Sequence, residues 1–260
     1  MILKWLTHPL IRGKDFNDPH TSILRLQIIQ EKPFLQKIYE EWYTSEIAAL
    51  PNDREPILEI GSGPGFLDRY LPDLITSDIL LLPNVRLVLD GRRLPFSDQT
   101  LGSIVLTDVL HHISRPYDFL LEAARCVRPK GVLVMHEPWV TPWSRFIYKW
   151  LHHEPFEPNI QKWEFPTNGP LSGANSAIPW ILFERDKERF EREFPTWHIR
   201  TIQLGVPFRY ILSGGISYWF SMPGWSFPIW RVLEQVLSPW MESLAMFALI
   251  VLERTHVVRS

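Results

Sequence analysis

One short stretch constrains the fold of this chain more than any other: an apolar run with an acid near its end passes into three glycines at alternate positions. The run covers residues 57–60 and contains Glu59, and Gly61, Gly63 and Gly65 follow it. A short apolar run bounded by turn signals is typical of a buried strand. Glycines directly after the run let the backbone turn sharply and approach a ligand where a Cβ atom would clash. The stretch therefore predicts an α/β fold with a nucleotide-type cofactor site at the end of a strand.

The glycine spacing differs from the dinucleotide fingerprint G-x-G-x-x-G. Phe66 occupies the sixth position of that fingerprint, and the third glycine comes one residue early, at Gly65. An NAD-dependent oxidoreductase is therefore disfavoured. From this stretch alone, a glycine-rich turn in an ordinary α/β protein stays open as an alternative.

Acids also stand at the ends of the next two predicted strands. Residues 74–78 are predicted as a strand that ends at Asp78, and residues 85–89 as a strand followed by Asp90. An acid after the second strand suits the hydroxyl groups of a ribose. Only residues 79–84 separate the two strands, which is too few for the usual crossover helix of a parallel pair. We therefore expect an extended loop there.

Taken in order, residues 54–138 resemble the class I S-adenosylmethionine (SAM) methyltransferases, and among them the type 11 family. The resemblance rests on acid-x-Gly-x-Gly-x-Gly at 59–65, on Leu-Pro-Phe at 94–96, and on His-His at 111–112 after a predicted fourth strand at 103–106. It implies an α/β, Rossmann-like doubly wound sheet, mostly parallel with an antiparallel last strand. An N-terminal helical segment and hydrophobic insertions would be added to that sheet. The cofactor implied is S-adenosyl-L-methionine.

The resemblance also implies which residues bind the cofactor. Asp78 would hold the ribose hydroxyls, and Asp90 would accept a hydrogen bond from the adenine amino group. A short helix predicted at 66–71 would direct its N-terminus at the carboxylate of the amino-acid moiety, because free N–H groups and the helix dipole favour an anion there. The residues expected to bind the cofactor are Glu59, Gly61, Ser62, Gly63, Gly65, Asp78, Asp90, Gly91 and Thr107.

Candidates for a general base are the ionisable groups at the carboxyl ends of the fourth and fifth predicted strands, where open α/β sheets bind ligands. With the fifth strand at 132–135, these groups are Asp108, His111, His112, His136 and Glu137. We choose Glu137, His111 and Asp108 as catalytic candidates. A pocket-lining or structural role is the alternative for each. A positioned base typically contributes about 10²- to 10⁴-fold to the rate.

The sequence predicts no metal site. His152, His153 and Glu154 offer ligand chemistry, but adjacent histidines on a helix point about 100° apart, unlike the i, i+4 pair of known metal motifs. The single cysteine, Cys126, falls on an apolar helical stripe and is expected to be a buried structural thiol. One cysteine makes no internal disulfide, which fits a reducing compartment.

The segments around this core divide the chain. We expect an N-terminal helical cap at 1–50, with an amphipathic helix that begins at Pro33, and a SAM-binding domain at 51–260. A helix from the capping residue Ser114 to about residue 128, a short charged helix at 184–193, and last strands at 197–204 and 246–253 complete the predicted elements. Insertions are expected at about 139–183 and 208–243, and ten of the twelve tryptophans lie after residue 138. For the second insertion a lid over an apolar substrate is favoured, with peripheral membrane contact and a homodimer surface as alternatives.

Composition narrows the function. A net charge of −2 and a pI near 6.5 give no reason to expect a nucleic-acid partner. No signal-peptide pattern and no run of about 18 to 20 apolar residues is present, so a cytoplasmic location is expected. The favoured function is SAM-dependent methyl transfer to a small or lipid-like, including lipid-linked, organic acceptor, with oxygen preferred over carbon. The alternative is a non-catalytic SAM-binding subunit or sensor. No Asn-Pro-Pro-aromatic motif follows the fourth strand, which disfavours a nucleobase amine.

Overall fold

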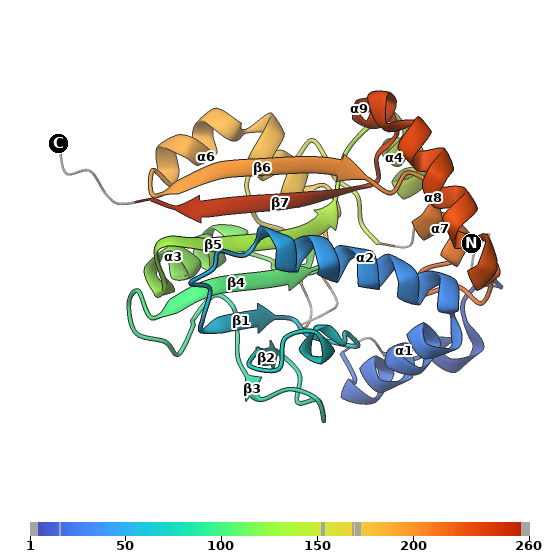
Figure 1. Ribbon diagram of the computed structural model, residues 1–260, viewed down its shortest axis with the longest axis horizontal. Helices are drawn as coiled ribbons and strands as arrows, with labels where there is room; N and C mark the ends of the chain where they lie inside the picture. Colours follow the sequence, from blue (N-terminus) through green and yellow to red (C-terminus); the bar gives the residue numbers. More distant parts are fainter. Residues whose placement is uncertain (1–4, 16, 152–153, 168, 170–172, 256–260) are drawn as a thin grey trace.

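The computed structural model describes residues 5–15, 17–151, 154–167, 169 and 173–255. Its centre is a seven-stranded sheet with the order β3-β2-β1-β4-β5-β7-β6 (Figure 1). The first five strands in this order are parallel to one another, and β7 runs antiparallel to both β5 and β6. The predicted doubly wound, mostly parallel fold with an antiparallel last strand is therefore confirmed. The strands are β1 (Ile57–Ile60), β2 (Ile75–Asp78), β3 (Leu87–Val88), β4 (Leu101–Thr107), β5 (Val127–Pro138), β6 (Trp197–Gly205) and β7 (Phe247–Arg254).

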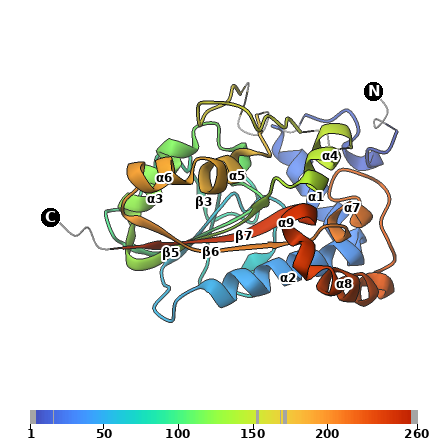
Figure 2. The ribbon, with the colours of Figure 1, turned by 90° about the horizontal axis from the view of Figure 1, so that it is seen from above.

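Helices cover both faces of the sheet. Figure 2 shows α2 and α8 on one face and α3 and α6 on the other. Short 3₁₀ turns lie at Pro9–Ile11, Leu67–Arg69, Leu110–His112, Gly224–Ser226 and Ser238–Trp240, and a π-helical turn at Ile181–Arg185. The α-helices are α1 (Pro19–Glu31), α2 (Pro33–Ala49), α3 (Pro116–Cys126), α4 (Pro142–Trp150), α5 (Ile178–Trp180), α6 (Lys187–Glu193), α7 (Arg209–Ser213), α8 (Phe227–Val236) and α9 (Met241–Leu244).

The predicted amphipathic helix is α2, and it packs along one face of the sheet. Pro33 occupies its first turn, where a missing N–H costs no helical hydrogen bond. Its buried stripe joins a core cluster with residues from β1, β4 and β7. The buried residues of this stripe are Phe34, Leu35, Ile38, Tyr39, Trp42, Tyr43 and Glu46.

Two local predictions were wrong. The helix expected at 66–71 is only the single 3₁₀ turn Leu67–Arg69, and the Phe66 backbone before it, with φ −146°, is not helical. No helix dipole is therefore available to a cofactor carboxylate there. Ser114 does not cap α3, because Arg115 is the N-cap residue and the Ser114 hydroxyl instead accepts a hydrogen bond from Arg92.

The strand β3 is short, and the segment between β2 and β3 forms the expected loop without a helix. The backbone N–H groups of Arg86 and Leu89 donate to carbonyls of residues 76 and 78 on β2. These bonds hold the loop against β2, so the strand ends stay aligned although no crossover helix is present.

The second insertion is tied to α2 by buried charges. The Lys32 ammonium donates to the backbone carbonyls of Ser213, Gly215 and Tyr218. On α7, the buried Arg209 guanidinium pairs with a glutamate on α2 and another on α8, at 2.6 and 2.5 Å. Because a buried charge is costly without partners, these contacts fix α7 and α8 over the end of α2.

Candidate functional site

A cavity of about 730 Å³ lies at the carboxyl ends of the parallel strands. Its volume falls within the range of about 300 to 1,000 Å³ that is usual for small-molecule sites. All nine residues expected to bind the cofactor line this cavity, and so do the catalytic candidates Asp108 and His112. The three other base candidates, His111, His136 and Glu137, are not part of its wall.

The turn after β1 requires its glycines. Gly61 has a φ of +69°, and a Cβ atom there would lie 2.7 Å from the methyl carbons of Val109. A Cβ atom on Gly65 would lie 2.7 Å from the Ser62 carbonyl oxygen and 2.9 Å from the hydroxyl of Tyr43. These separations are shorter than van der Waals contact, so larger residues would push the turn away from its neighbours. The glycines therefore make a narrow backbone cradle at the cavity wall.

Asp78 is held rigidly at the end of β2. Its carboxylate accepts hydrogen bonds from the backbone N–H groups of Gly63, at 2.9 Å, and Leu80, at 2.8 Å. Burial raises the pKa of Asp78, while the hydrogen bonds to these N–H groups oppose that rise. The carboxylate therefore ties the glycine turn to β2 and also lines the cavity.

Glu59 and Ser62 form a buried pair at the base of the turn. The Ser62 hydroxyl donates to the Glu59 carboxylate and accepts a hydrogen bond from the backbone N–H of Ser77 at 3.1 Å. Burial raises the pKa of Glu59 to about 8. Glu59 is therefore mostly protonated at neutral pH, and the Ser62 side chain serves the turn itself.

Asp90 does not stand alone at the end of β3. The Arg92 guanidinium donates to both carboxylate oxygens, with distances of 2.6 to 3.1 Å, and its Nη1 donates to the Ser114 hydroxyl. Hydrogen bonding from Arg92 lowers the pKa of Asp90. Sequence analysis missed Arg92, although an acid and a base two positions apart beside a predicted site are a signal for such a pair. Any adenine at this end would meet the pair and not a lone carboxylate.

Thr107 and His136 contact the same buried acid on α2. The Thr107 hydroxyl donates to Glu46 at 2.9 Å, and His136 Nδ1 lies 3.2 Å from the same oxygen. The His136 ring stacks on Trp42, with 5.4 Å between ring centroids. Burial lowers the pKa of His136 to about 3. His136 is therefore a neutral side chain that packs against Trp42 and does not line the cavity.

Asp108 projects into the cavity from the exit of β4. Its backbone has a φ of +63°, a conformation that costs energy in a residue other than glycine and is often found at functional sites. The backbone N–H of Asp108 donates to the His136 carbonyl at 2.7 Å, which holds this strained turn on β5. Burial raises the pKa of Asp108 to about 7. Among the three catalytic candidates chosen from sequence, Asp108 is the one whose carboxylate reaches the cavity.

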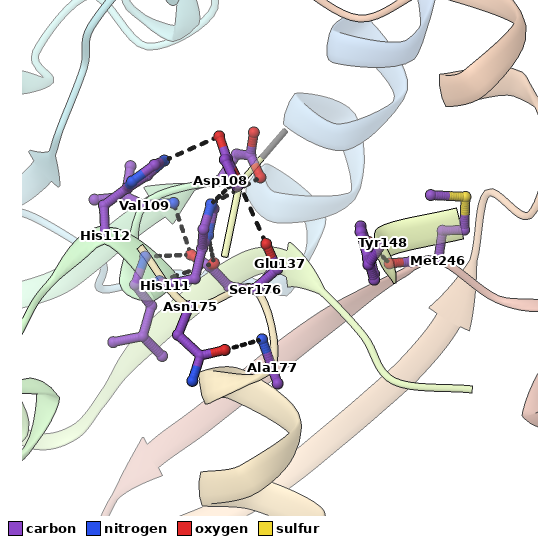
Figure 3. Close-up of polar contacts among 12 residues, drawn as sticks. Asp108, Val109, His111, His112, Glu137, Tyr148, Asn175, Ser176, Ala177 and Met246 are labelled. Carbon is purple, nitrogen blue, oxygen red and sulfur yellow. Dashed lines mark hydrogen bonds and ion pairs between the residues drawn. The ribbon is translucent and has the colours of Figure 1, made fainter. Parts of the chain in front are cut away.

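Glu137 lies behind the cavity wall, beneath the turn that carries His111. Its side chain is fully buried and accepts hydrogen bonds from the backbone N–H groups of Val109 and Leu110 and from His111 Nδ1 (Figure 3). Both carboxylate oxygens of Glu137 accept hydrogen bonds from this turn, and Glu137 does not line the cavity. It positions His111, whose ring is 1% exposed. Burial lowers the pKa of His111, but hydrogen bonds with Glu137 and Glu154 outweigh it and hold that pKa well above its ordinary value.

The N-terminal helical cap and the first insertion supply further cavity residues, which no sequence pattern singled out. Arg25 comes from α1, in the predicted N-terminal helical cap, and no sequence signal marked it. Glu154 comes from the first insertion, where it was considered only with His152 and His153, which lie outside the described residues. The Glu154 carboxylate lies 3.5 Å from His111 Nε2 and 3.8 Å from His112 Nε2. Tyrosines at 39, 148 and 210 also line this end of the cavity.

Three of the four tryptophans of the second insertion are exposed, and the fourth, Trp230, packs against a core cluster. Trp219, Trp225 and Trp240 are 52%, 74% and 57% exposed, and none of them lines the cavity wall. These three rings are therefore not placed to contact a substrate in the cavity, and the lid expected for this segment stays a prediction. The segment contributes Tyr210, Ile216 and Ser217 to the wall instead. Within the described part of the chain, no helix combines the length and apolar character needed to cross a membrane.

Comparison with known proteins agrees with the geometry. Residues 58–135 match the sequence model of a family described as Methyltransferase domain. A chain of the complex between the Haloferax volcanii Trm112 methyltransferase activator and a protein described as a methyltransferase has a similar structure. It gives a TM-score of 0.51 at 12% identity, over 92% of this chain and 97% of that one. A protein from Listeria monocytogenes described as a SAM-dependent methyltransferase gives 0.50 at 10% identity, over 84% and 98%. No curated protein matches the chain in sequence.

Proposed function

We propose that this chain, an enzyme that carries a SAM-dependent methyltransferase domain and uses SAM as its cofactor, transfers a methyl group to a hydroxyl oxygen of a small or lipid-like organic acceptor. One observation carries the proposal: the glycine cradle, Asp78 and the Asp108 carboxylate line a single cavity. The strand β4 lies next to β1 in the sheet, so Asp108 follows the strand beside the glycine turn. A cofactor and an acceptor would share this space, with a base at their meeting point.

The residues present fit the cofactor. A Cβ atom at Gly61 or Gly65 would fill the cradle or displace its neighbours, so the turn is built for close approach of a ligand to the backbone. Asp78 offers a fixed carboxylate to a ribose diol, and Asp90 with Arg92 offers both an acceptor and donors to a purine edge. When bound, SAM supplies a methyl group that is already electrophilic.

The chain itself therefore has to align the acceptor, exclude water and take up one proton. Alignment in well-oriented systems is worth up to about 7 to 11 kcal/mol. The elements α1, α2 and both insertions close over the strand ends and contribute to the cavity wall, which limits access of water. Asp108 is placed to accept the proton of an acceptor hydroxyl. A hydroxyl needs this proton removed as the new bond forms, which favours transfer to oxygen over carbon.

The side chains on the part of the wall opposite the glycine turn indicate what kind of acceptor would fit. The rings of Tyr39, Tyr148 and Phe247 provide apolar surface, while Arg25 and Glu154 add charged groups. An acceptor that combines an aromatic or aliphatic body with a polar group fits this wall. A lipid-linked acceptor would need an opening through which its lipid chain leaves the cavity. Assays with extracts enriched in lipids, run beside assays with soluble compounds, would test this class of acceptor.

The proposal is tested with SAM carrying an isotopically labelled methyl group, incubated with pools of lipid, glycan and phenolic acceptors. Products are identified by mass. We expect Asp108→Asn to lower turnover by about 10²- to 10⁴-fold while SAM affinity changes little. The matched control is Asp98→Asn, because the Asp98 side chain is 72% exposed and does not line the cavity. Turnover of Asp108→Asn equal to wild type would overturn the assignment of the base, and SAM binding without any turnover would favour a non-catalytic SAM-binding protein.

A further inference from the structure

Two imidazoles and one carboxylate converge at the acceptor end of the cavity. The Glu154 carboxylate faces both rings, with 3.5 Å to His111 Nε2 and 3.8 Å to His112 Nε2. The two ring centroids are 4.2 Å apart, and the three ligand atoms lie within 4.8 Å of one another. We propose that these three side chains form a binding site for one divalent transition-metal cation. This inference rests on the proposed function only where it says that the cation binds the methyl acceptor.

The far side of each imidazole is anchored in the way that metal-binding histidines require. His111 Nδ1 lies 2.8 Å from the buried Glu137 carboxylate, and His112 Nδ1 lies 3.2 Å from the Gly173 carbonyl. A carbonyl only accepts, so His112 Nδ1 carries the hydrogen and His112 Nε2 presents its lone pair toward Glu154. Metal-ligating histidines almost always donate their other N–H to a carboxylate or carbonyl. Glu137 thereby acts as the positioning residue for His111.

The spacing of the three groups suits a metal. Four ligands bound tetrahedrally at about 2.0 to 2.2 Å are separated by roughly 3.3 to 3.6 Å. The contacts of 3.5 and 3.8 Å to Glu154 are therefore close to the ligand separations of an occupied site, and small side-chain rotations would close the difference. Two histidines with one glutamate are also the donor set of known catalytic zinc sites that keep one position open. Imidazole ligands favour Zn²⁺ or Fe²⁺ over Mg²⁺ or Ca²⁺.

The charges around the cluster also favour a cation. Three carboxylates surround the imidazole pair, on Asp108, Glu137 and Glu154, and the Arg25 guanidinium interacts with Glu154 and Asp108. A proton shared between His111 and Glu154 is the competing way to balance this charge. Either a bound metal ion or a shared proton would balance the charge of these carboxylates. Only the first alternative predicts that the protein binds a metal ion.

The open side of the site faces the acceptor. His112 and Glu154 line the cavity, as does Asp108, whose carboxylate lies 3.9 Å from His111 Nε2. A cation bound here would leave a coordination position toward the space beside Asp108. We therefore infer that the acceptor carries an oxygen donor that binds the cation, as a phenolate, an alkoxide or a carboxylate does.

Direct metal binding tests the proposal. Untagged protein is stripped with a chelator and titrated with Co²⁺, followed by its visible d–d absorption, and Zn²⁺ content is measured by mass spectrometry. We expect one metal ion per chain in wild type. Mutation of a residue that supports a metal ligand typically weakens metal binding by about 10- to 100-fold. Loss of a ligand itself should cost at least as much, so we expect His112→Ala and Glu154→Gln each to weaken Co²⁺ binding by at least that factor. The matched control is His198→Ala, because His198 is exposed on β6 and does not line the cavity.

Two controls distinguish loss of the metal site from unfolding of the variant. Circular dichroism of each variant shows whether it is folded, and Zn²⁺ should raise the Tm of wild type and of His198→Ala, because a ligand that binds only the folded state stabilises it. The proposal is overturned if wild type binds no Co²⁺, or if folded His112→Ala and Glu154→Gln bind it as tightly as wild type. These titrations contain neither SAM nor acceptor, so failure of methyl transfer and failure of the metal site would be seen separately.

Discussion

Replacing Asp78 by asparagine should weaken SAM binding without unfolding the protein. In the structure the carboxylate accepts two backbone N–H bonds, from Gly63 and Leu80, and lines the cavity. Asparagine has one oxygen in place of two, so the variant keeps one of these bonds and offers an amide in place of a charged acceptor. A hydrogen bond to a charged group is worth about 1.5 to 3 kcal/mol. At 1.36 kcal/mol per factor of ten, we expect the Kd for SAM to rise about 10- to 150-fold.

Isothermal titration calorimetry with SAM and with S-adenosylhomocysteine measures this change. Both ligands carry the same ribose, so both should weaken by the same factor. The matched control is Asp73→Asn, which alters an exposed carboxylate just before β2 and should leave both affinities unchanged. A Kd for Asp78→Asn within about twofold of wild type, in a folded protein, would refute the assignment of Asp78 to the ribose.

Three further outcomes follow from the structure. Arg209→Met should lower the free energy of unfolding by about 3 to 5 kcal/mol, because it leaves the buried carboxylate of Glu234 without its ion-pair partner. The other carboxylate that Arg209 contacts, on Glu41, keeps its ion pair with Arg231. Arg231→Met, at an exposed ion pair, should change the free energy of unfolding by no more than about 1 kcal/mol in denaturant titrations. The pKa of Glu59 is about 8 in the folded state against an ordinary 4.5, so the folded protein retains a proton that the unfolded chain has lost, and stability falls as the pH rises from about 4.5 to about 8. The Tm of wild type should fall relative to that of Glu59→Gln across this window, and parallel curves would contradict the burial argument. Trp225→Ser should leave SAM affinity and Tm unchanged, since a surface substitution is usually worth within about 0.5 kcal/mol, and a large loss would show that this ring reaches the site.

The parts of the site that were predictable depend on short-range patterns. Gly61, Gly63 and Gly65 follow a buried strand directly, and backbone geometry makes their positions informative without tertiary detail. Asp78 and Asp90 end strands whose carboxyl ends meet at one edge of a parallel sheet, so they reach the same cavity. The sequence could also place Asp108, because the strand before it is strongly apolar.

The parts that failed depend on side-chain direction. Residues at the end of a strand alternate between the two faces of the sheet, so His136 faces Trp42 on α2 while Glu137 turns under the 3₁₀ turn that carries His111. When the last residue of a predicted strand is not known, the sequence does not decide which of two adjacent residues, such as His136 and Glu137, faces the cavity. The same limit hides the partnership of His111 with Glu154, because the two lie far apart in sequence and meet only when the first insertion folds over the strand ends.

The second insertion shows a related limit. Its tryptophans indicate an apolar surface, yet composition does not say which side of a short helix meets the protein. The structure buries Phe227 of α8 against α2, while Trp225 and Trp240 are exposed. The contacts that decide this orientation are made by Lys32 and Arg209, two charged residues that a hydrophobic pattern does not reveal.

The central claim is that one cavity brings the methyl group of SAM to an acceptor hydroxyl. It is tested most directly by following a labelled methyl group from SAM into product in the presence of acceptor pools, while S-adenosylhomocysteine is measured in the same reaction. The account predicts that one label enters an acceptor oxygen for each S-adenosylhomocysteine formed, and that Asp108→Asn almost abolishes both. Label found on carbon would contradict the proposed chemistry. Tight SAM binding with no label transferred to any acceptor class would contradict the claim itself.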